Sequence, residues 1–316
     1  MLGALLSLLG ALGVPAAAPP SDLVHQTLDP LPASKGREVL AFHTAGASVW
    51  QDYEWGALTS IAVYGSPVDP RLLSTARAHG VRVLLVCPAG CFGTDARALG
   101  GKWGDETFVR GWVSRSVEAV RQHGAGGIFL DIEASPLNVT QATQLTAMVR
   151  RLADSLRAAQ PGSLLAMAAF QLGLLLPHCG ATGLPDYAGL ARAVDRLVVM
   201  NYDANPWRRE GPDDFANAPL FVVNRSLHCY GQFGVDAKKL LLAFPWYGFA
   251  YTCAPTESAA ARPTEELGCN ATAARTVGWA CPAPNCSGVA GCKPHDSGSV
   301  PPNSQRCIRA DRRDGL

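Results

Sequence analysis

The chain has 316 residues and a formal net charge of +1, with 27 Lys and Arg against 26 Asp and Glu. Charged residues make up only 17% of the sequence, below the roughly 25% of average soluble domains, and 48% are hydrophobic. Because no basic excess is available to neutralise phosphates, we do not expect nucleic acid as a partner. The apolar content is enough for a sizeable core and excludes wholesale disorder.

Residues 1–18 have the pattern of a secretory signal peptide. An apolar run of about a dozen residues ends at Pro15 and is followed by small residues, although the usual positive charge ahead of it is missing. A membrane anchor is the alternative, but the run is shorter than the ~20 residues that cross a bilayer. We therefore expect cleavage and no membrane association afterwards.

Cysteines and glycosylation sequons also suit the secretory pathway. The ten cysteines are an even number, as in disulfide-bonded secreted proteins. Sequons of the type N-x-S/T begin at Asn138, Asn224, Asn270 and Asn285. Together with a leader, they indicate a glycoprotein of the lysosomal or secreted route.

Short apolar runs without strict alternation predict strands that are covered on both faces. They span residues 38–45, 58–64, 81–87, 127–133, 164–170, 195–202 and 240–247. Helical patterns lie between them at 69–79, with Pro70 first, at 105–123, and at 141–160, with Thr140 as N-cap. This alternation predicts an α/β fold with a parallel sheet.

Two α/β architectures fit this order of elements, a doubly wound sheet and a (β/α)8 TIM-type barrel. The doubly wound alternative lacks its glycine fingerprint, because the glycines at 124–127 precede a strand instead of following one. We therefore predict the barrel, with seven recognisable strands and the eighth absent. The first and seventh strands would then present open edges.

The character of the sequence changes after Tyr251. We expect a barrel domain over residues 36–252 and a Cys-rich insertion or tail over 253–316. The cysteines of that segment are Cys253, Cys269, Cys281, Cys286, Cys292 and Cys307. Zinc is the alternative to disulfides, but no paired CxxC knuckle occurs, so we favour disulfides and expect no metal and no other cofactor.

Acidic residues end the fourth predicted strand. Asp131 and Glu133 are two apart, so their side chains share a face, at the strand end where barrels place catalytic groups. Two close carboxylates cannot both ionise freely, so one pKa rises and a proton donor results. Protonation of a glycosidic oxygen needs such a donor. The alternative is a pair of acids beside the positive end of the following helix.

Further polar and aromatic residues end the sixth and seventh predicted strands. The sixth ends in Met200-Asn201-Tyr202-Asp203, and the seventh in Pro245-Trp246-Tyr247-Gly248. Aromatic rings at a barrel mouth can stack on sugars, although loop packing is the alternative for Trp246. Acids, a Tyr–Asp pair and aromatics together favour a carbohydrate hydrolase.

With these motifs the sequence resembles glycoside hydrolase family 18, and within it the chitobiase-type enzymes, from about residue 38 to about residue 286. The family pattern DxxDxDxE corresponds to residues 126–133, and MxYD corresponds to Met200, Tyr202 and Asp203. A PWYG-type motif corresponds to residues 245–248.

The resemblance implies substrate-assisted, retaining hydrolysis of β-1,4-linked N-acetylglucosamine, in chitin oligosaccharides and in the chitobiose core of asparagine-linked glycans. It implies a lysosomal enzyme, and we expect a monomer. Glu133 would be the general acid and then the base, Asp131 would orient the 2-acetamido group, and Tyr202 would hydrogen-bond its carbonyl. Sugar-binding residues would be Asp203, Trp246, Tyr247 and Met200.

The chain departs from the family pattern at three places. Gly126 replaces the first Asp of the octet, and Phe129 replaces the next acidic position, beneath Asp131. A phenyl ring there offers the carboxylate no hydrogen bond and would weaken charge stabilisation. The closing strand with its Trp is missing from the expected order. The alternatives are therefore an inactive chitinase-like sugar-binding protein, and a non-functional truncated isoform from an alternative transcript or a misjoined gene model.

Overall fold

The computed structural model describes residues 37–44, 49–65, 68–90, 102–175, 179, 182–204, 216–254 and 270–278. The expectations for the leader, for the sequon at Asn285 and for the cysteines at 269 and 281–307 fall outside these residues. Within them, no helix is both long enough and apolar enough to cross a membrane.

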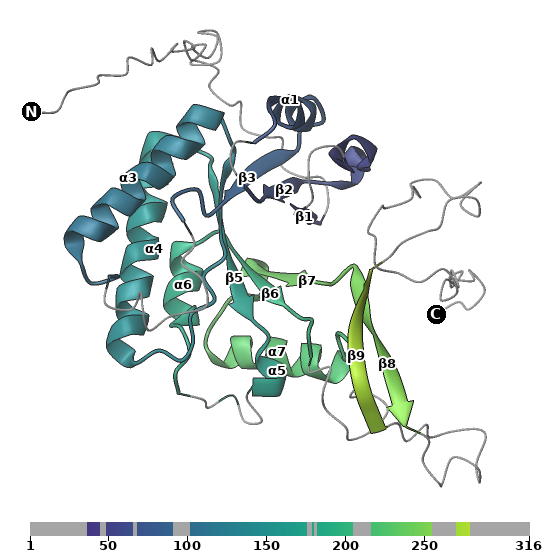
Figure 1. Ribbon diagram of the computed structural model, residues 1–316. Helices are drawn as coiled ribbons and strands as arrows, with labels where there is room; N and C mark the ends of the chain where they lie inside the picture. Colours follow the sequence, from purple (N-terminus) through teal and green to yellow (C-terminus); the bar gives the residue numbers. More distant parts are fainter. Residues whose placement is uncertain are drawn as a thin grey trace, which may run out of the picture.

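Seven parallel strands form one curled sheet in strict sequence order (Figure 1). The strands are β1 (Leu40–His43), β2 (Ser60–Val63), β3 (Arg82–Val86), β4 (Gly127–Leu130), β5 (Leu164–Phe170), β6 (Arg196–Met200) and β7 (Leu240–Ala243). All seven lie within the predicted runs, and β5 matches its run at both ends. Among the described residues β1 and β7 have no second strand neighbour, so the sheet is a barrel with open edges, as predicted.

Helices connect the strands and cover the outside of the sheet (Figure 1). They are α1 (Pro70–Ala78), α3 (Glu106–His123), α4 (Val139–Ala159), α5 (Leu172–Leu175), α6 (Tyr187–Ala193) and α7 (Leu220–Gln232). Single 3-10 turns lie at Val49–Asp52, Trp55–Ala57 and Ala237–Lys239. The last three α-helices were not predicted. The first two of them are short, whereas the buried residues of α7 recur at helical spacing, a pattern that the sequence analysis missed.

The N-cap predicted for α4 was wrong by two residues. Asn138, not Thr140, caps this helix: its side chain accepts from the Gln141 backbone N–H at 2.8 Å, and the Gln141 side chain accepts from the Asn138 N–H at 3.0 Å. This reciprocal capping box satisfies two backbone donors that a helix start leaves open. Thr140 therefore lies inside the first turn.

Strand residues alternate between an outer and an inner apolar layer. On β4, Ile128 and Leu130 join the large cluster beneath the helices, whereas Phe129 belongs to the inner cluster of the barrel. Phe129 is 1% exposed, and its ring meets Phe42 edge-on with centroids 4.9 Å apart. The barrel interior below the strand ends is therefore packed and apolar.

Two adjacent glycines, Gly126 and Gly127, lie at the start of β4, and a side chain would meet a different obstacle at each. Gly127 has a φ of +154°, and a Cβ there would collide with the backbone carbonyl of Leu164 on β5. At Gly126 a Cβ would instead meet the aliphatic stem of Arg82. The position where the family pattern has its first Asp is thus covered by a long side chain from β3.

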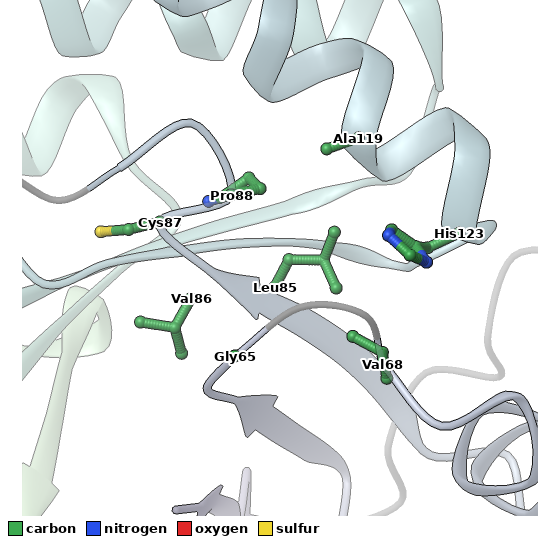
Figure 2. A pocket seen from close by; sticks show the side chains of 8 residues that line it. All are labelled: Gly65, Val68, Leu85, Val86, Cys87, Pro88, Ala119 and His123. Atoms are coloured by element: carbon green, nitrogen blue, oxygen red, sulfur yellow. The ribbon is translucent and has the colours of Figure 1, made fainter. Parts of the chain in front are cut away.

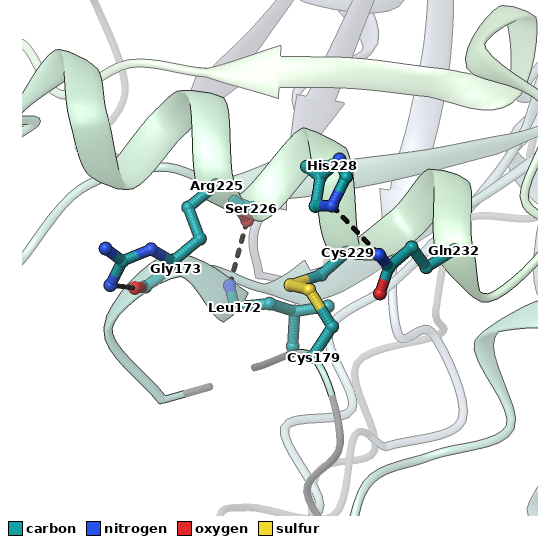
Figure 3. Close-up of a disulfide and its surroundings, with 8 residues drawn as sticks. All are labelled: Leu172, Gly173, Cys179, Arg225, Ser226, His228, Cys229 and Gln232. Atoms are coloured by element: carbon teal, nitrogen blue, oxygen red, sulfur yellow. Dashed lines mark hydrogen bonds between the residues drawn. A yellow bond between two sulfur atoms is a disulfide. The ribbon is translucent and has the colours of Figure 1, made fainter. Parts of the chain in front are cut away.

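One disulfide lies fully within the described part of the chain. Cys179 pairs with Cys229 on α7, 50 residues apart, and Figure 3 shows it beside the hydrogen bond from the Leu172 N–H to the Ser226 hydroxyl. Cys87 is disulfide-bonded as well. The expectation of disulfides is confirmed for these cysteines.

Residues 270–278, within the predicted Cys-rich segment, form a strand that was not predicted. β8 (Tyr247–Ala254) pairs in antiparallel fashion with β9 (Asn270–Gly278) in a two-stranded ribbon separate from the barrel sheet (Figure 1). The β9 sequence NATAARTVG has one valine as its only large apolar residue, so no hydrophobic period indicated a strand. The seventh barrel strand correspondingly ends at Ala243, earlier than residue 247.

Candidate active site

The predicted acidic and tyrosine residues meet at the carboxyl end of the barrel. Strand β4 ends three residues earlier than predicted, so Asp131 and Glu133 lie in the segment after it. Tyr202 and Asp203 lie in the segment after β6. The charges of Asp131 and Asp203 both act on Glu133, and those of Glu133, Asp131 and Asp203 act on Tyr202. Residues from alternate strands of a barrel share a layer, which accounts for this grouping.

Glu133 has the properties of a proton donor. Its pKa is raised above the ordinary value of 4.5, first by burial and then by the negative charges of Asp131 and Asp203. Within the described residues, no hydrogen bond holds its carboxyl group. The sequence predicted a raised pKa from the neighbouring carboxylate, whereas burial is the larger cause.

Asp131 is held from two neighbouring strands. The Tyr64 hydroxyl, which follows β2, donates to Asp131 Oδ2 at 3.0 Å. The Asp131 backbone N–H points to Cys87 Sγ, at 3.2 Å, at the end of β3. Tyr64 is 41% exposed and was not among the predicted site residues. Its position at the end of an apolar run, where barrels place functional groups, was the available signal.

Asp203 is fixed by the start of the ribbon. The Tyr247 hydroxyl donates to Asp203 Oδ1 at 2.6 Å, and the Asp203 N–H donates to Asn217 Oδ1 at 2.7 Å. Asn217 Nδ2 in turn donates to the Tyr247 carbonyl at 3.0 Å. Asn217 was missed because it belongs to none of the motifs.

Tyr202 remains a hydrogen-bond donor at any physiological pH. Burial first, and then the charges of Glu133, Asp131 and Asp203, raise the pKa of Tyr202 to about 12. Its ring lies 6.4 Å from that of Tyr247, at 74°. The two phenols therefore line the same side of the carboxylate cluster.

The remaining predicted sugar-binding residues differ in exposure. Met200 is half-buried and packs against the inner cluster, two positions before Tyr202. Trp246 is 87% exposed, so within the described part of the chain it is not packed under a loop. It is thus an exposed flat apolar side chain, directly before Tyr247 in the sequence.

Accessible sequons flank the barrel. Asn138 is exposed at the start of α4, five positions after Glu133 in the chain, and Asn224 is exposed on α7. Asn270 is the first residue of β9. These positions remain proposals as glycosylation sites.

A cavity of about 220 Å³ has none of the carboxylates in its lining (Figure 2). Its lining comes from the ends of β2 and β3 and from α3, and consists of Gly65, Val68, Leu85, Val86, Cys87, Pro88, Ala119 and His123. This lining contains none of the predicted site residues. No cluster of three or more metal-ligating side chains occurs in the part of the chain that the structure describes.

Sequence comparison places these residues in a known context. The profile of the family "Glycosyl hydrolases family 18" matches residues 99–284. The di-N-acetylchitobiase of Mus musculus is 28% identical over 218 residues, which are 68% of this chain and 55% of that protein. A class V chitinase of Arabidopsis thaliana is 26% identical and covers 61% of this chain and 54% of its own length. The chain thus spans about half the length of the relatives it matches.

Solved structures share the fold. A class V chitinase of Nicotiana tobaccum in complex with NAG4 superposes with a TM-score of 0.54 and 19% identity, and covers 68% of each chain. A chitinase of Cycas revoluta in complex with allosamidin gives 0.56 and 18%, and covers 67% of this chain and 69% of that one. At these identities the likeness establishes the barrel architecture alone.

Proposed function

The chain belongs to glycosyl hydrolase family 18, and from that membership we propose that it hydrolyses β-1,4-linked N-acetylglucosamine in chitin oligosaccharides and in the chitobiose core of asparagine-linked glycans. The observation that carries the proposal is the raised pKa of Glu133 next to the carboxylates of Asp131 and Asp203 and the Tyr202 phenol. The names of the relatives, di-N-acetylchitobiase and class V chitinase, support this substrate class.

In the first step Glu133 transfers its proton to the glycosidic oxygen. The carbonyl oxygen of the substrate's own 2-acetamido group attacks C1, the C1–O bond to the leaving sugar breaks, and that sugar departs as an alcohol. The remaining sugar carries an oxazolinium-type positive charge. Asp131 orients the acetamido group and stabilises this charge, while the Tyr202 hydroxyl donates a hydrogen bond to the acetamido carbonyl.

In the second step the Glu133 carboxylate takes a proton from water. The resulting hydroxide attacks C1, the bond between C1 and the acetamido oxygen breaks, and Glu133 is again protonated. Two inversions at C1 retain the anomeric configuration. Asp203 contacts the reacting sugar, and Met200, Trp246 and Tyr247 bind the sugar faces.

A lysosomal location is part of the proposal, with secretion as the alternative. The signal-like leader and the sequons support entry into the secretory pathway. A mildly acidic lumen keeps more of Glu133 protonated, because its pKa is raised by burial. The chain would act there as a monomer.

A second function has one specific observation in its favour. Phe129, buried beneath Asp131, replaces an acidic position of the family pattern, and a sugar-binding protein without turnover would tolerate that replacement. Such a protein would still use the exposed Trp246 to stack on sugar rings.

The test compares two disaccharides at about pH 5, where the raised pKa keeps more of Glu133 in its proton-donating form. The secreted, size-purified chain is incubated with diacetylchitobiose and, as the matched control, with the same disaccharide lacking both acetyl groups. We expect N-acetylglucosamine from the first and no product from the second, because the nucleophile is then absent. Calorimetric binding of diacetylchitobiose without turnover by a cooperatively folded chain would establish the sugar-binding protein instead.

A further inference from the structure

The side chain beneath Asp131 cannot hold its carboxylate. Phe129, two positions before Asp131, stands where the family pattern DxxDxDxE has an acidic residue, and it is 1% exposed within the barrel. Its ring meets Phe42 edge-on at 4.9 Å. A catalytic carboxylate needs a fixed orientation, so the chain requires another source of restraint at this point.

That restraint comes from β2. The Phe42 ring lies 6.3 Å from the ring of Tyr64, so a row of aromatic side chains runs from Phe129 through Phe42 to the end of β2. The row ends in a hydroxyl group, which donates to Asp131 Oδ2 at 3.0 Å. This row of packed rings thus places one polar atom, the Tyr64 hydroxyl oxygen, next to the carboxylate of Asp131.

We propose that Tyr64 is the positioning residue for Asp131 in this chain and performs the restraint that residue 129 cannot supply. Fixing one carboxylate oxygen fixes the plane of the group, and with it the direction from which Asp131 meets the acetamido group of the substrate. This role rests on the proposed function, because Asp131 has an acetamido group to orient only if the chain binds such a sugar.

The chemistry of the contact suits a permanent restraint. The pKa of Tyr64 is raised above its usual value by burial, and then by the charge and hydrogen bond of Asp131 and the nearby Tyr202 and Glu133. The phenol therefore stays protonated and keeps donating. A hydrogen bond to an ionised acceptor is stronger than one between neutral groups.

The test is Tyr64→Phe, which removes only the hydroxyl. We expect kcat on diacetylchitobiose to fall about 10- to 100-fold, with KM changed by less than about 3-fold, because the substrate still binds while its acetamido group is less well oriented. The groups facing Asp131 are Tyr64 from β2, Tyr202 from β6 and Glu133 on its own segment.

The matched control is Tyr53→Phe. The Tyr53 hydroxyl also makes a side-chain hydrogen bond, at 2.8 Å to His43 Nδ1, on the outer side of β1. This variant loses the same atom from the same residue type but leaves the Asp131 contact in place. We expect it to keep the kcat and the KM of the unmodified chain.

A second background separates positioning from general support. In Asp131→Asn, the additional change Tyr64→Phe should lower the residual kcat by less than about 3-fold, since the two residues act as one unit. An equal loss on both backgrounds, or an unchanged kcat in Tyr64→Phe, overturns the positioning role and leaves the proposed function intact. A folded chain without any turnover overturns the proposed function, and the role of Tyr64 with it.

Discussion

The Tyr247 hydroxyl donates to Asp203 Oδ1 at 2.6 Å and so joins the end of β6 to the start of β8. Asp203 has a φ of +54°, in the left-handed region that non-glycine residues rarely adopt. Its backbone N–H and the Tyr247 carbonyl are both bonded to the side chain of Asn217. This amide therefore maintains a backbone conformation that costs on the order of 1 kcal/mol.

Asn217→Ala should lower kcat about 10-fold, because the Asp203 backbone loses its acceptor and Tyr247 is no longer tied to it. Steady-state kinetics on diacetylchitobiose check this. Gln122→Ala is the control, since Gln122 is an exposed amide on α3 whose side chain donates to Glu118, away from the candidate site. Unchanged kcat in Asn217→Ala would show that Asp203 needs no such support.

Glu133 should destabilise the folded chain at neutral pH. Its pKa is raised on folding, so the folded state binds the proton more tightly, and the resulting stability is present at low pH and lost as pH rises through the raised value. Glu133→Gln should therefore have a higher Tm than the unmodified chain at about pH 7, and the difference should vanish towards about pH 4.

The control is a glutamate whose pKa is shifted in the opposite direction on folding. The pKa of the exposed Glu118 is lowered, first by its hydrogen bond from Arg121. Glu118→Gln should consequently leave Tm at neutral pH equal or slightly lower. Scanning calorimetry across pH compares the two variants, and a Glu133→Gln chain without any gain at neutral pH would contradict the burial of Glu133.

The two glycines at the start of β4 should respond differently to alanine. Gly127→Ala places a methyl group against the Leu164 carbonyl and forces an unfavourable φ, so we expect a loss of about 3 kcal/mol or more. Gly126→Ala displaces the stem of Arg82, which can move, so we expect a loss below about 1 kcal/mol. Denaturant unfolding measures both, and equal losses would mean that Arg82 is as rigid as the β5 backbone.

Much of the fold could be predicted from local sequence patterns. The seven strands were predicted because strands covered on both faces are short apolar runs. The helix α1 was predicted with Pro70 at its first position, and α3 from apolar residues that recur at helical spacing. β9 was missed because Asn270–Gly278 is paired with β8 through its backbone and carries no hydrophobic period. A partner elsewhere in the chain decided its structure.

Prediction of the candidate site from the sequence was likewise limited to residues that belong to a recognisable motif. Asp131, Glu133, Tyr202 and Asp203 could be grouped because strand ends of a parallel barrel meet. Tyr64 also ends an apolar run, but it belongs to none of the motifs, and its hydrogen bond to Asp131 depends on side-chain packing that the sequence does not show. The leading cause of the raised Glu133 pKa, burial, is likewise a property of packing and not of residue spacing.

The release of N-acetylglucosamine from diacetylchitobiose by the unmodified chain, Glu133→Gln and Glu118→Gln tests the role of Glu133 most directly. Glutamine keeps the shape of the side chain but cannot donate the proton, so turnover by Glu133→Gln should fall at least about 100-fold, while Glu118→Gln stays at the unmodified rate. Full turnover by a folded Glu133→Gln chain would contradict general acid catalysis by this residue.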